Sequence, residues 1–165
     1  MQKHASLIGL GALHNAALAA ELQSQLGNDV GLAYSQPQPA GGVVSTASDY
    51  ARFLRKLLRI ELRMGGRLGG KAVCTNPATC QQASYTPIPA TEQWHYSLGH
   101  WVESDPLVGD GAFSSAGSFG FYPWVSASQR WYGIVARRDA NGGAAYDSVQ
   151  CGRLIRKAWL SGTEQ

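Results

Sequence analysis

The strongest periodic pattern of apolar and polar residues in the chain begins just after residue 46. Its apolar positions recur at spacings of three and four residues, which predicts an amphipathic helix with one buried side. These positions are Tyr50, Phe53, Leu54, Leu57 and Leu58. Thr46 or Ser48 precedes the run and can cap the helix, and Asp49 lies near the positive end of its dipole. We therefore expect a capped helix that packs on another element through this side.

A second helix is predicted over residues 14–26, which end at Gly27, a common stop for helices. Its apolar side consists of Leu18, Leu22 and Leu26. Residues 28–42 are rich in Gly, Pro and Gln, so we expect an irregular connector there.

A third helix is expected at the C-terminus, beginning at Asp147 or Ser148. Amphipathic helices normally bury their apolar residues and expose their charged ones. On this rule Val149, Ile155, Ala158 and Trp159 face inward, and Arg153, Arg156 and Lys157 face solvent.

Period-two alternation predicts strands at 94–103, 118–126 and 131–138. A short polar turn joins the last two, which predicts an antiparallel hairpin. In one continuous strand over 94–103, His95 and His100 point to opposite faces, so they are poor partners for one metal ion.

Helices before and after at least three antiparallel strands indicate an α+β fold. We expect 1–165 to form a single or partial domain, with an N-terminal helical segment over 1–29 and the main part over 30–165.

Composition describes an ordinary soluble globular chain, with 44% hydrophobic and 15% charged residues and a net charge of +3. The basic residues of 52–71 follow helical spacing without interleaved aromatics, which indicates a solvated helix face and no nucleic-acid partner. Gly65–Ala72 is glycine-rich like a phosphate loop, but a helix precedes it and Ala72 follows its lysine, so nucleotide binding is not expected. No cofactor and no metal site is predicted.

No apolar run is long enough to span a bilayer. The first 13 residues resemble a short signal peptide, with Ala17-Leu18-Ala19 as a candidate cleavage triplet, but their apolar stretch is barely long enough and export through it is not favoured.

Cys74 and Cys80 flank a turn-rich loop, so the sequence is compatible with either a small disulfide loop or two free thiols. A disulfide favours a periplasmic or secreted protein, and free thiols favour a cytoplasmic one. Cys151 lies in the C-terminal helix, where we expect an inert buried thiol.

A glycine- and serine-dense stretch over 109–124 leads into the aromatic hairpin. The small residues Ser115 to Ser118 let another molecule approach the backbone closely. Backbone N–H groups along such an edge can bind the negative charge that develops in acyl transfer. We therefore expect a ligand to dock here.

Two stretches resemble the serine beta-lactamase-like hydrolases, a family that includes class C beta-lactamases, esterases and D-aminopeptidases. Pro39–Phe53 (PAGGVVSTASDYARF) is similar to the family's segment PAGG-[VL]-x-ST-x-x-D-x-A-R-F. Phe113–Trp124 is similar to the family's third active-site motif. The resemblance implies the C-terminal part of the family's fold. It gives Ser115, Gly117 and Ser118 the third-motif positions, with the Ser118 N–H as half of an oxyanion hole. Substrate contacts are then expected at Ala116, Phe119 and Tyr122.

Two of the family's motifs are missing from the chain. No serine has a lysine three residues later, and Tyr34-Ser35-Gln36 is only a near miss to the second motif. Ser115 also replaces the usual Lys or His, which favours an ester or neutral amide over a substrate carrying a carboxylate. The resemblance therefore implies one part of a serine-dependent acyl hydrolase, inactive alone, that needs a complementing N-terminal part.

Two alternatives remain at this stage. One is a non-catalytic relic that binds a ligand or self-associates. The other is a self-contained hydrolase that uses Ser115 with His100 and Asp110.

Overall fold

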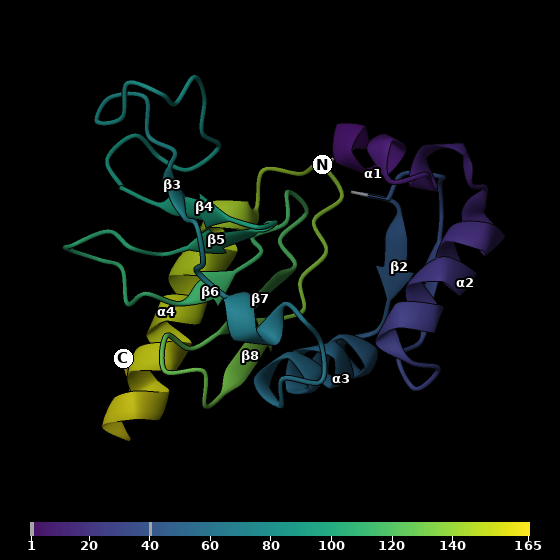
Figure 1. Ribbon diagram of the computed structural model, residues 1–165. Coiled ribbons are helices and arrows are strands. Elements are labelled where there is room, and N and C mark those ends of the chain that lie inside the picture. Colours follow the sequence, from purple (N-terminus) through teal and green to yellow (C-terminus); the bar gives the residue numbers. More distant parts are fainter. Residues whose placement is uncertain (1, 40) are drawn as a thin grey trace. The chain divides into compact units, whose positions relative to one another are not determined.

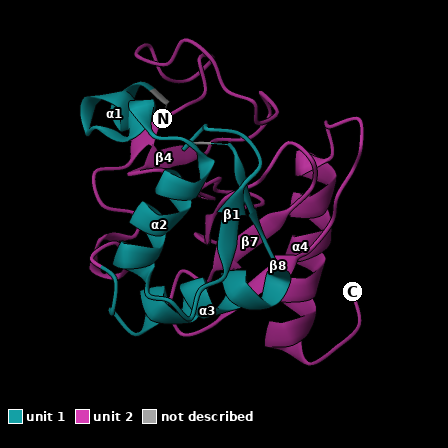
Figure 2. Cartoon of the chain, turned by 90° about the vertical axis from the view of Figure 1, so that its right-hand side faces the viewer, with its two compact units in different colours: residues 1–62 teal, residues 63–165 magenta. Residues whose placement is uncertain are grey.

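The computed structural model describes residues 2–39 and 41–165 and has an α+β fold (Figure 1). Met1 and Ala40, which belong to the signal-like stretch and to the Pro39–Phe53 segment, lie outside the described residues. The chain divides into two compact units, Met1–Leu62 and Arg63–Gln165 (Figure 2). The expected α+β class, with antiparallel strands and flanking helices, is confirmed.

The first unit is a helical layer with one small sheet. Its elements are α1 (Gln2–Leu7), the 3₁₀ helix η1 (Leu10–Ala12), α2 (Asn15–Leu26), β1 (Leu32–Tyr34), β2 (Val43–Ser45) and α3 (Ala47–Leu58). Helix α2 confirms the prediction for residues 14–26 and ends at Gly27 with a φ of 94°. The connector prediction was wrong in part, because β1 pairs antiparallel with β2. Three-residue strands are too short to show a period, so tertiary pairing decides them.

Helix α3 begins as the sequence predicts. The Thr46 hydroxyl accepts the Asp49 N–H at 3.1 Å and donates to the Asp49 carboxylate at 2.6 Å. The same carboxylate accepts the Gly31 N–H at 3.1 Å, which ties the start of α3 to the segment before β1. Leu54 and Leu57 are buried. The helix therefore buries the apolar side that its pattern defines.

The second unit is a six-stranded antiparallel sheet with the order β3-β4-β5-β6-β7-β8. The strands are β3 (Val73–Cys74), β4 (His95–Ser97), β5 (His100–Val102), β6 (Phe113–Ser114), β7 (Tyr122–Val125) and β8 (Tyr132–Val135). A 3₁₀ helix, η2 (Gly65–Arg67), precedes β3, and α4 (Ala145–Ser161) follows β8. Helix α4 lies along one face of the sheet (Figures 1 and 2). The predicted antiparallel hairpin of the last two strands is confirmed, with Val125 opposite Tyr132.

The single strand predicted over 94–103 is wrong, because it folds into a hairpin of β4 and β5. Leu98 and Gly99 form its turn with φ values of 41° and 97°. Two successive positive φ values are typical of the tight turns that join antiparallel strands. The turn puts Ser97 opposite His100, so His95 and His100 point to the same face, not to opposite faces. They still do not meet, since His95 lies opposite Val102.

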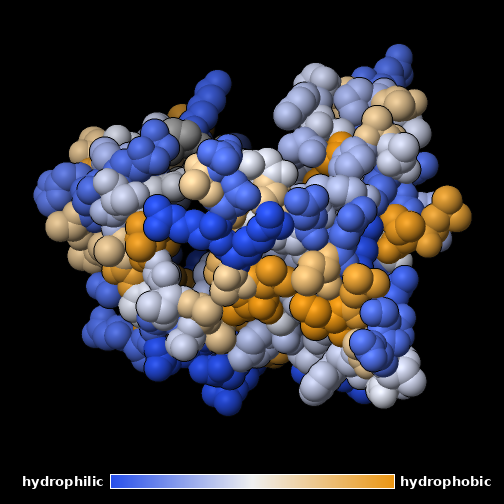
Figure 3. Space-filling model, turned by 180° about the vertical axis from the view of Figure 1, so that it is seen from behind, coloured by the Kyte–Doolittle hydropathy of each residue, from blue (hydrophilic) through white to orange (hydrophobic). Residues whose placement is uncertain are grey.

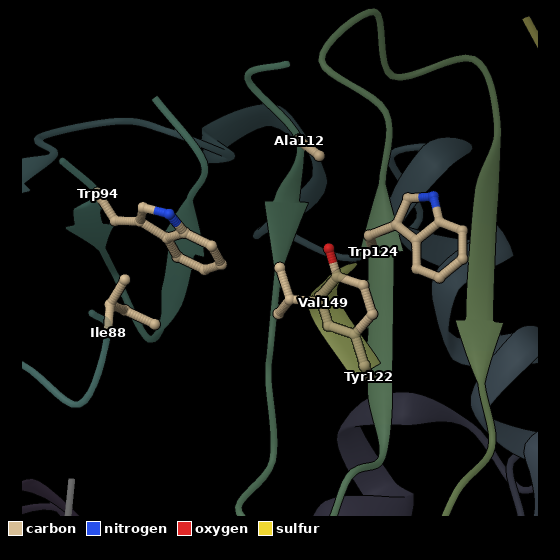
Figure 4. Close-up of a cluster of buried hydrophobic side chains, with 6 residues drawn as sticks. All are labelled: Ile88, Trp94, Ala112, Tyr122, Trp124 and Val149. Carbon is tan, nitrogen blue, oxygen red and sulfur yellow. The ribbon is translucent and has the colours of Figure 1, made fainter. Parts of the chain in front are cut away.

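The core lies between the sheet and α4. Tyr122 and Trp124 project from β7 on the same side as Val149 of α4 (Figure 4). Gly152 of α4 lets the helix approach closely, because a Cβ there would lie 2.4 Å from the Tyr122 ring. A bulkier residue at this position would push α4 away from the sheet.

The predicted orientation of α4 is wrong for its longer residues. Arg153 and Arg156 face the sheet, with 11% and 1% of their side chains exposed, whereas Ile155 and Trp159 are 46% and 72% exposed. Val149 does face inward, as expected. The reason is chemical: buried carboxylates of the sheet layer pair with the two arginines, and a paired guanidinium can enter a core that an unpaired one cannot.

Glu92 and Glu103 are the central acceptors of this buried network. Arg153 donates to both Glu92 oxygens, at 3.0 and 2.8 Å, and its guanidinium lies 5.6 Å from the centre of the Trp94 ring. Burial opposes ionisation of Glu92, but hydrogen bonds from Arg153, Tyr146 and Trp94 outweigh it and lower the pKa of that carboxyl.

Glu103 is fully buried and accepts from Arg156 at 2.8 Å and from the Tyr122 hydroxyl. Arg156 also donates to Tyr122 at 2.5 Å and to Asp110 at 2.5 Å. Burial raises the pKa of Tyr122, and the neighbouring Glu103 carboxylate raises it further. The phenol therefore stays protonated and acts as a donor to Glu103.

Candidate functional site

The stretch Ser115–Ser118 extends β6 into the turn that precedes β7. The Ser115 N–H donates to the Pro123 carbonyl at 3.1 Å, and the Gly117 N–H donates to the Phe121 carbonyl at 2.9 Å. The predicted strand over 118–126 therefore begins only at Tyr122, because residues 117–121 form the turn. The third-motif positions end a strand here and do not start one.

The amides of this stretch alternate in direction. Ser115 and Gly117 point their N–H groups at β7, so the Ala116 N–H between them points to the opposite side, and Ser118 follows in the turn. Among residues 2–39 and 41–165, neither the Ala116 N–H nor the Ser118 N–H has a hydrogen-bond partner. β5 does not cover them, since it begins at His100 and its pairing with β6 stops at Ser114. Each is a backbone donor left over for a ligand, and an oxyanion hole uses such donors in convergence with a second N–H group.

Loop 139–144 holds the turn in place. The Ser118 carbonyl accepts the Ala144 N–H at 3.1 Å, and the Phe119 carbonyl accepts the Asp139 N–H at 2.7 Å. Gly120 has a φ of 91° and is buried, a conformation that a residue with a Cβ rarely adopts. These bonds use the carbonyl groups and leave the amide donors fixed in direction, which lowers the reorganisation needed to bind an anion.

The six residues predicted for the site divide between two surroundings. Ser115, Ser118 and Phe119 are exposed, with 57% of Phe119 accessible, and Gly117 lies among them. Ala116 packs against the core, and Tyr122 is fully buried with its hydroxyl bound to Glu103 and Arg156. Position explains the division: Ala116 and Tyr122 flank the turn on the side of the core, whereas Ser118 and Phe119 lie in the turn itself.

The relay of Ser115, His100 and Asp110 is not formed. His100 Nε2 accepts the Gly69 N–H at 2.9 Å, and its ring meets Phe113 edge-on. Asp110 is engaged by Arg156 and by the Ala112 N–H. Burial lowers the pKa of His100, so the ring is held neutral as an acceptor. The self-contained hydrolase alternative is therefore wrong in this geometry.

The cysteines resolve into one pair and one free thiol. Cys74 and Cys80 form a disulfide with their Cα atoms 6.1 Å apart. Cys151 is exposed on α4, so the expectation of a buried thiol is wrong. Its helix turns the arginines inward and carries Cys151 outward. In the described part of the chain, no cluster of His, Cys, Asp and Glu could hold a metal ion.

Sequence reasoning missed the buried network that fixes the sheet on which the site stands. Its signal was present: Arg153 and Arg156 lie three residues apart and so share one side of the helix, and Glu103 ends a predicted strand. Charge alone does not tell whether such arginines are solvated or paired.

No model of a known protein family matches the chain, and no curated protein is similar to it. The beta-lactamase-like resemblance thus rests on the residues quoted above. Within residues 2–39 and 41–165, no helix has both the length and the apolar character needed to cross a membrane.

Proposed function

We propose that this chain forms the substrate-side wall of a serine-dependent acyl hydrolase. Ser115, Gly117 and Ser118 occupy the third-motif positions, and the Ser118 N–H supplies half of the oxyanion hole. The nucleophile belongs to a complementing part that carries a Ser-x-x-Lys motif. The chain alone is therefore inactive toward esters and amides.

The observation that carries this proposal is that the Ala116 and Ser118 N–H groups have no hydrogen-bond partner among residues 2–39 and 41–165. A tetrahedral intermediate places negative charge on an oxygen atom, and one fixed N–H donor to that atom contributes roughly 3 kcal/mol to transition-state stabilisation. Gly117 between the donors has no side chain that would block the acyl group. The exposed Phe119 ring offers apolar contact to the substrate.

The substrate class follows from what Ser115 lacks. A lysine at this position would attract a carboxylate, whereas a neutral hydroxyl only donates or accepts a hydrogen bond. We therefore assign an ester or a neutral amide of small size. The Cys74–Cys80 disulfide supports an oxidising compartment, periplasmic or extracellular.

Fluorophosphonate labelling and hydrolysis of a p-nitrophenyl ester test the proposal. The isolated chain should show neither. Mixed with a beta-lactamase-like N-terminal segment that carries Ser-x-x-Lys, it should turn over the ester, and Gly117→Trp should abolish the turnover. The matched control is Ser128→Trp, in the exposed turn between β7 and β8, which should retain it. Labelling of the isolated chain, or complemented turnover that survives Gly117→Trp, would refute the proposal.

A second candidate function is a non-catalytic domain that self-associates. Leu154, Ile155 and Trp159 on α4 are exposed, and monomeric proteins rarely expose large contiguous apolar patches, which favours self-association. The same assays separate the two functions, because a non-catalytic domain gains no turnover from any complementing segment.

A further inference from the structure

The segment between β3 and β4 is held in place by a cross-link and by hydrogen bonds more than by apolar packing. Residues 75–94 run through turns and loops, and Cys80, Ile88 and Trp94 are their buried apolar side chains. These loops lie at the upper left of Figure 1 and the upper right of Figure 3, where mainly hydrophilic and intermediate side chains are seen. The Cys74–Cys80 disulfide closes the first loop. A segment that buries so little apolar surface needs such a constraint to stay ordered.

Asn76 lies inside the loop that the disulfide closes, and it is 2% exposed. Its side-chain N–H groups donate to the carbonyl groups of Ala90 and Glu92 at 2.8 and 3.1 Å, and its side-chain oxygen accepts the Ala78 N–H at 2.9 Å. The Cys80 N–H donates to the Asn76 backbone carbonyl at 2.9 Å. Losing one of these bonds would leave a polar group unpaired away from water. The closed loop therefore clamps the backbone of Glu92.

The Glu92 carboxylate joins this clamp to α4. It accepts from the Tyr146 hydroxyl, and it accepts from Arg153 at 3.0 and 2.8 Å. Tyr146 lies in the first turn of α4, two residues after Ala144, which precedes the helix. The Ala144 N–H donates to the Ser118 carbonyl at 3.1 Å and so holds the turn before β7. Hydrogen bonds and short backbone links thus connect the disulfide loop with the Ser118 turn, all within the second unit.

We propose that oxidation of Cys74 and Cys80 to the disulfide orders the Ser118 turn through these contacts. The two thiols lose two protons and two electrons to a low-molecular-weight disulfide, which leaves as two thiols, and the S–S bond forms. In the reduced chain the loop is not closed, so Asn76 leaves its carbonyl partners more readily and Glu92 is held less firmly against α4. The ordered turn therefore follows oxidation. This inference concerns the order of the turn and does not rest on the proposed function.

The size of the effect follows from the loop. Closing a loop this short lowers the unfolded population on the order of 30-fold. Only part of this reaches Ser118, because Arg156 also attaches α4 to the sheet. Coupling between two sites in one protein is typically about 5-fold or more. We therefore expect the Ala144 N–H to exchange with solvent at least about 5-fold more slowly in the oxidised chain than in the reduced one.

Hydrogen exchange of the backbone amides, followed by NMR on the full chain, tests the proposal. Cys151→Ser in every sample removes the free thiol that would otherwise exchange with the disulfide. The oxidised sample is compared with one reduced by an excess of a dithiol, and the mass of each confirms its state. The Ser126 N–H, bound to Trp131 in the β7–β8 turn, is the internal reference. It lies outside the series of contacts and should change by less than about 2-fold.

Asn76→Ala cuts the series while the disulfide still forms. The difference between oxidised and reduced chain at Ala144 should then fall below about 2-fold. Thr79→Ala, at an exposed position of the same loop, is the matched control and should keep the full difference. If Asn76→Ala does not fold, Tyr146→Phe takes its place. It keeps the ring but loses the hydroxyl that donates to Glu92, so it should lower the difference at least about 2-fold.

Equal exchange at Ala144 in the oxidised and reduced chains would overturn the proposal. An equal acceleration at Ser126 on reduction would also overturn it, because the disulfide would then act on general stability alone. A difference that persists undiminished in folded Asn76→Ala, or in the Tyr146→Phe variant that replaces it, would show that the effect does not pass through Glu92.

Discussion

Replacement of Arg156 by methionine is the most direct test of how α4 is attached to the sheet. The guanidinium is 1% exposed and donates to Glu103, Asp110 and the Tyr122 hydroxyl. It also lies 5.4 Å from the centre of the Trp124 ring. Methionine fills much of the same volume but provides no donor, so it leaves the Glu103 carboxylate buried with less compensation.

The expected loss of stability follows from the Glu103 carboxylate, which stays buried without its main partner. Removing one partner of a buried ion pair costs about 3–5 kcal/mol of stability, because the remaining charge is neither hydrated nor paired. Arg153 reaches Glu103 only at 3.4 Å, so it replaces little of the lost interaction. The matched control is Arg137→Met, whose ion pairs are solvent-exposed at 3.6 Å and should contribute less than about 1 kcal/mol.

Urea unfolding followed by tryptophan fluorescence gives the free energy of unfolding of each variant from its midpoint at constant slope. Glu103→Gln in the Arg156→Met background should be less destabilising than it is alone, because the charge it removes is already unpaired. If Arg156→Met does not fold, Arg156→Lys replaces it. This variant keeps a charge but loses the planar geometry, so it should still be less stable than Arg137→Met. If Arg156→Met destabilises no more than Arg137→Met, the buried network does not hold α4 in place.

Two further predictions concern the disulfide and His100. The double variant Cys74→Ala/Cys80→Ala should lower the free energy of unfolding by about 2 kcal/mol, because it removes the closure of a short loop. The control Cys151→Ala should change the free energy of unfolding by less than about 0.5 kcal/mol. Equal urea midpoints for the two variants would contradict this prediction. The folded-state pKa of His100 lies below its ordinary value of 6.5, so its contribution to stability is complete above that value and declines as pH falls from 6.5 toward the folded-state pKa. Relative to His100→Gln, which cannot titrate, the original chain should lose stability as the pH falls below about 6.5, and parallel pH profiles would contradict the effect of burial on His100.

Local patterns predicted the elements whose signals are contained within a few residues. Helix α3 has its cap, its acidic first turn and its apolar side in one continuous run, so no distant residue was needed to place it. The β7–β8 hairpin likewise has its turn and both strands within one segment. The β4–β5 hairpin was missed although Gly99 marked it, because each half of 94–103 alternates by itself and the prediction overlooked the shift by one position that the two-residue turn introduces between the halves.

What the sequence determined by itself is therefore the α+β class, helix α2, the capped helix α3 and the last hairpin. The start predicted for α4 at Asp147 or Ser148 is wrong, because the helix begins at Ala145 without a side-chain cap. Tertiary structure alone decided which side of α4 faces the sheet, because burial of Arg153 and Arg156 depends on Glu92 and Glu103, which lie some 50 to 60 residues earlier in the chain. It also decided that β6 continues into a turn at Gly117, because the Gly117 N–H is bonded to the Phe121 carbonyl. Hydrophobic periodicity reports which residues avoid water, but it carries no information about which distant charge will pair with a buried one.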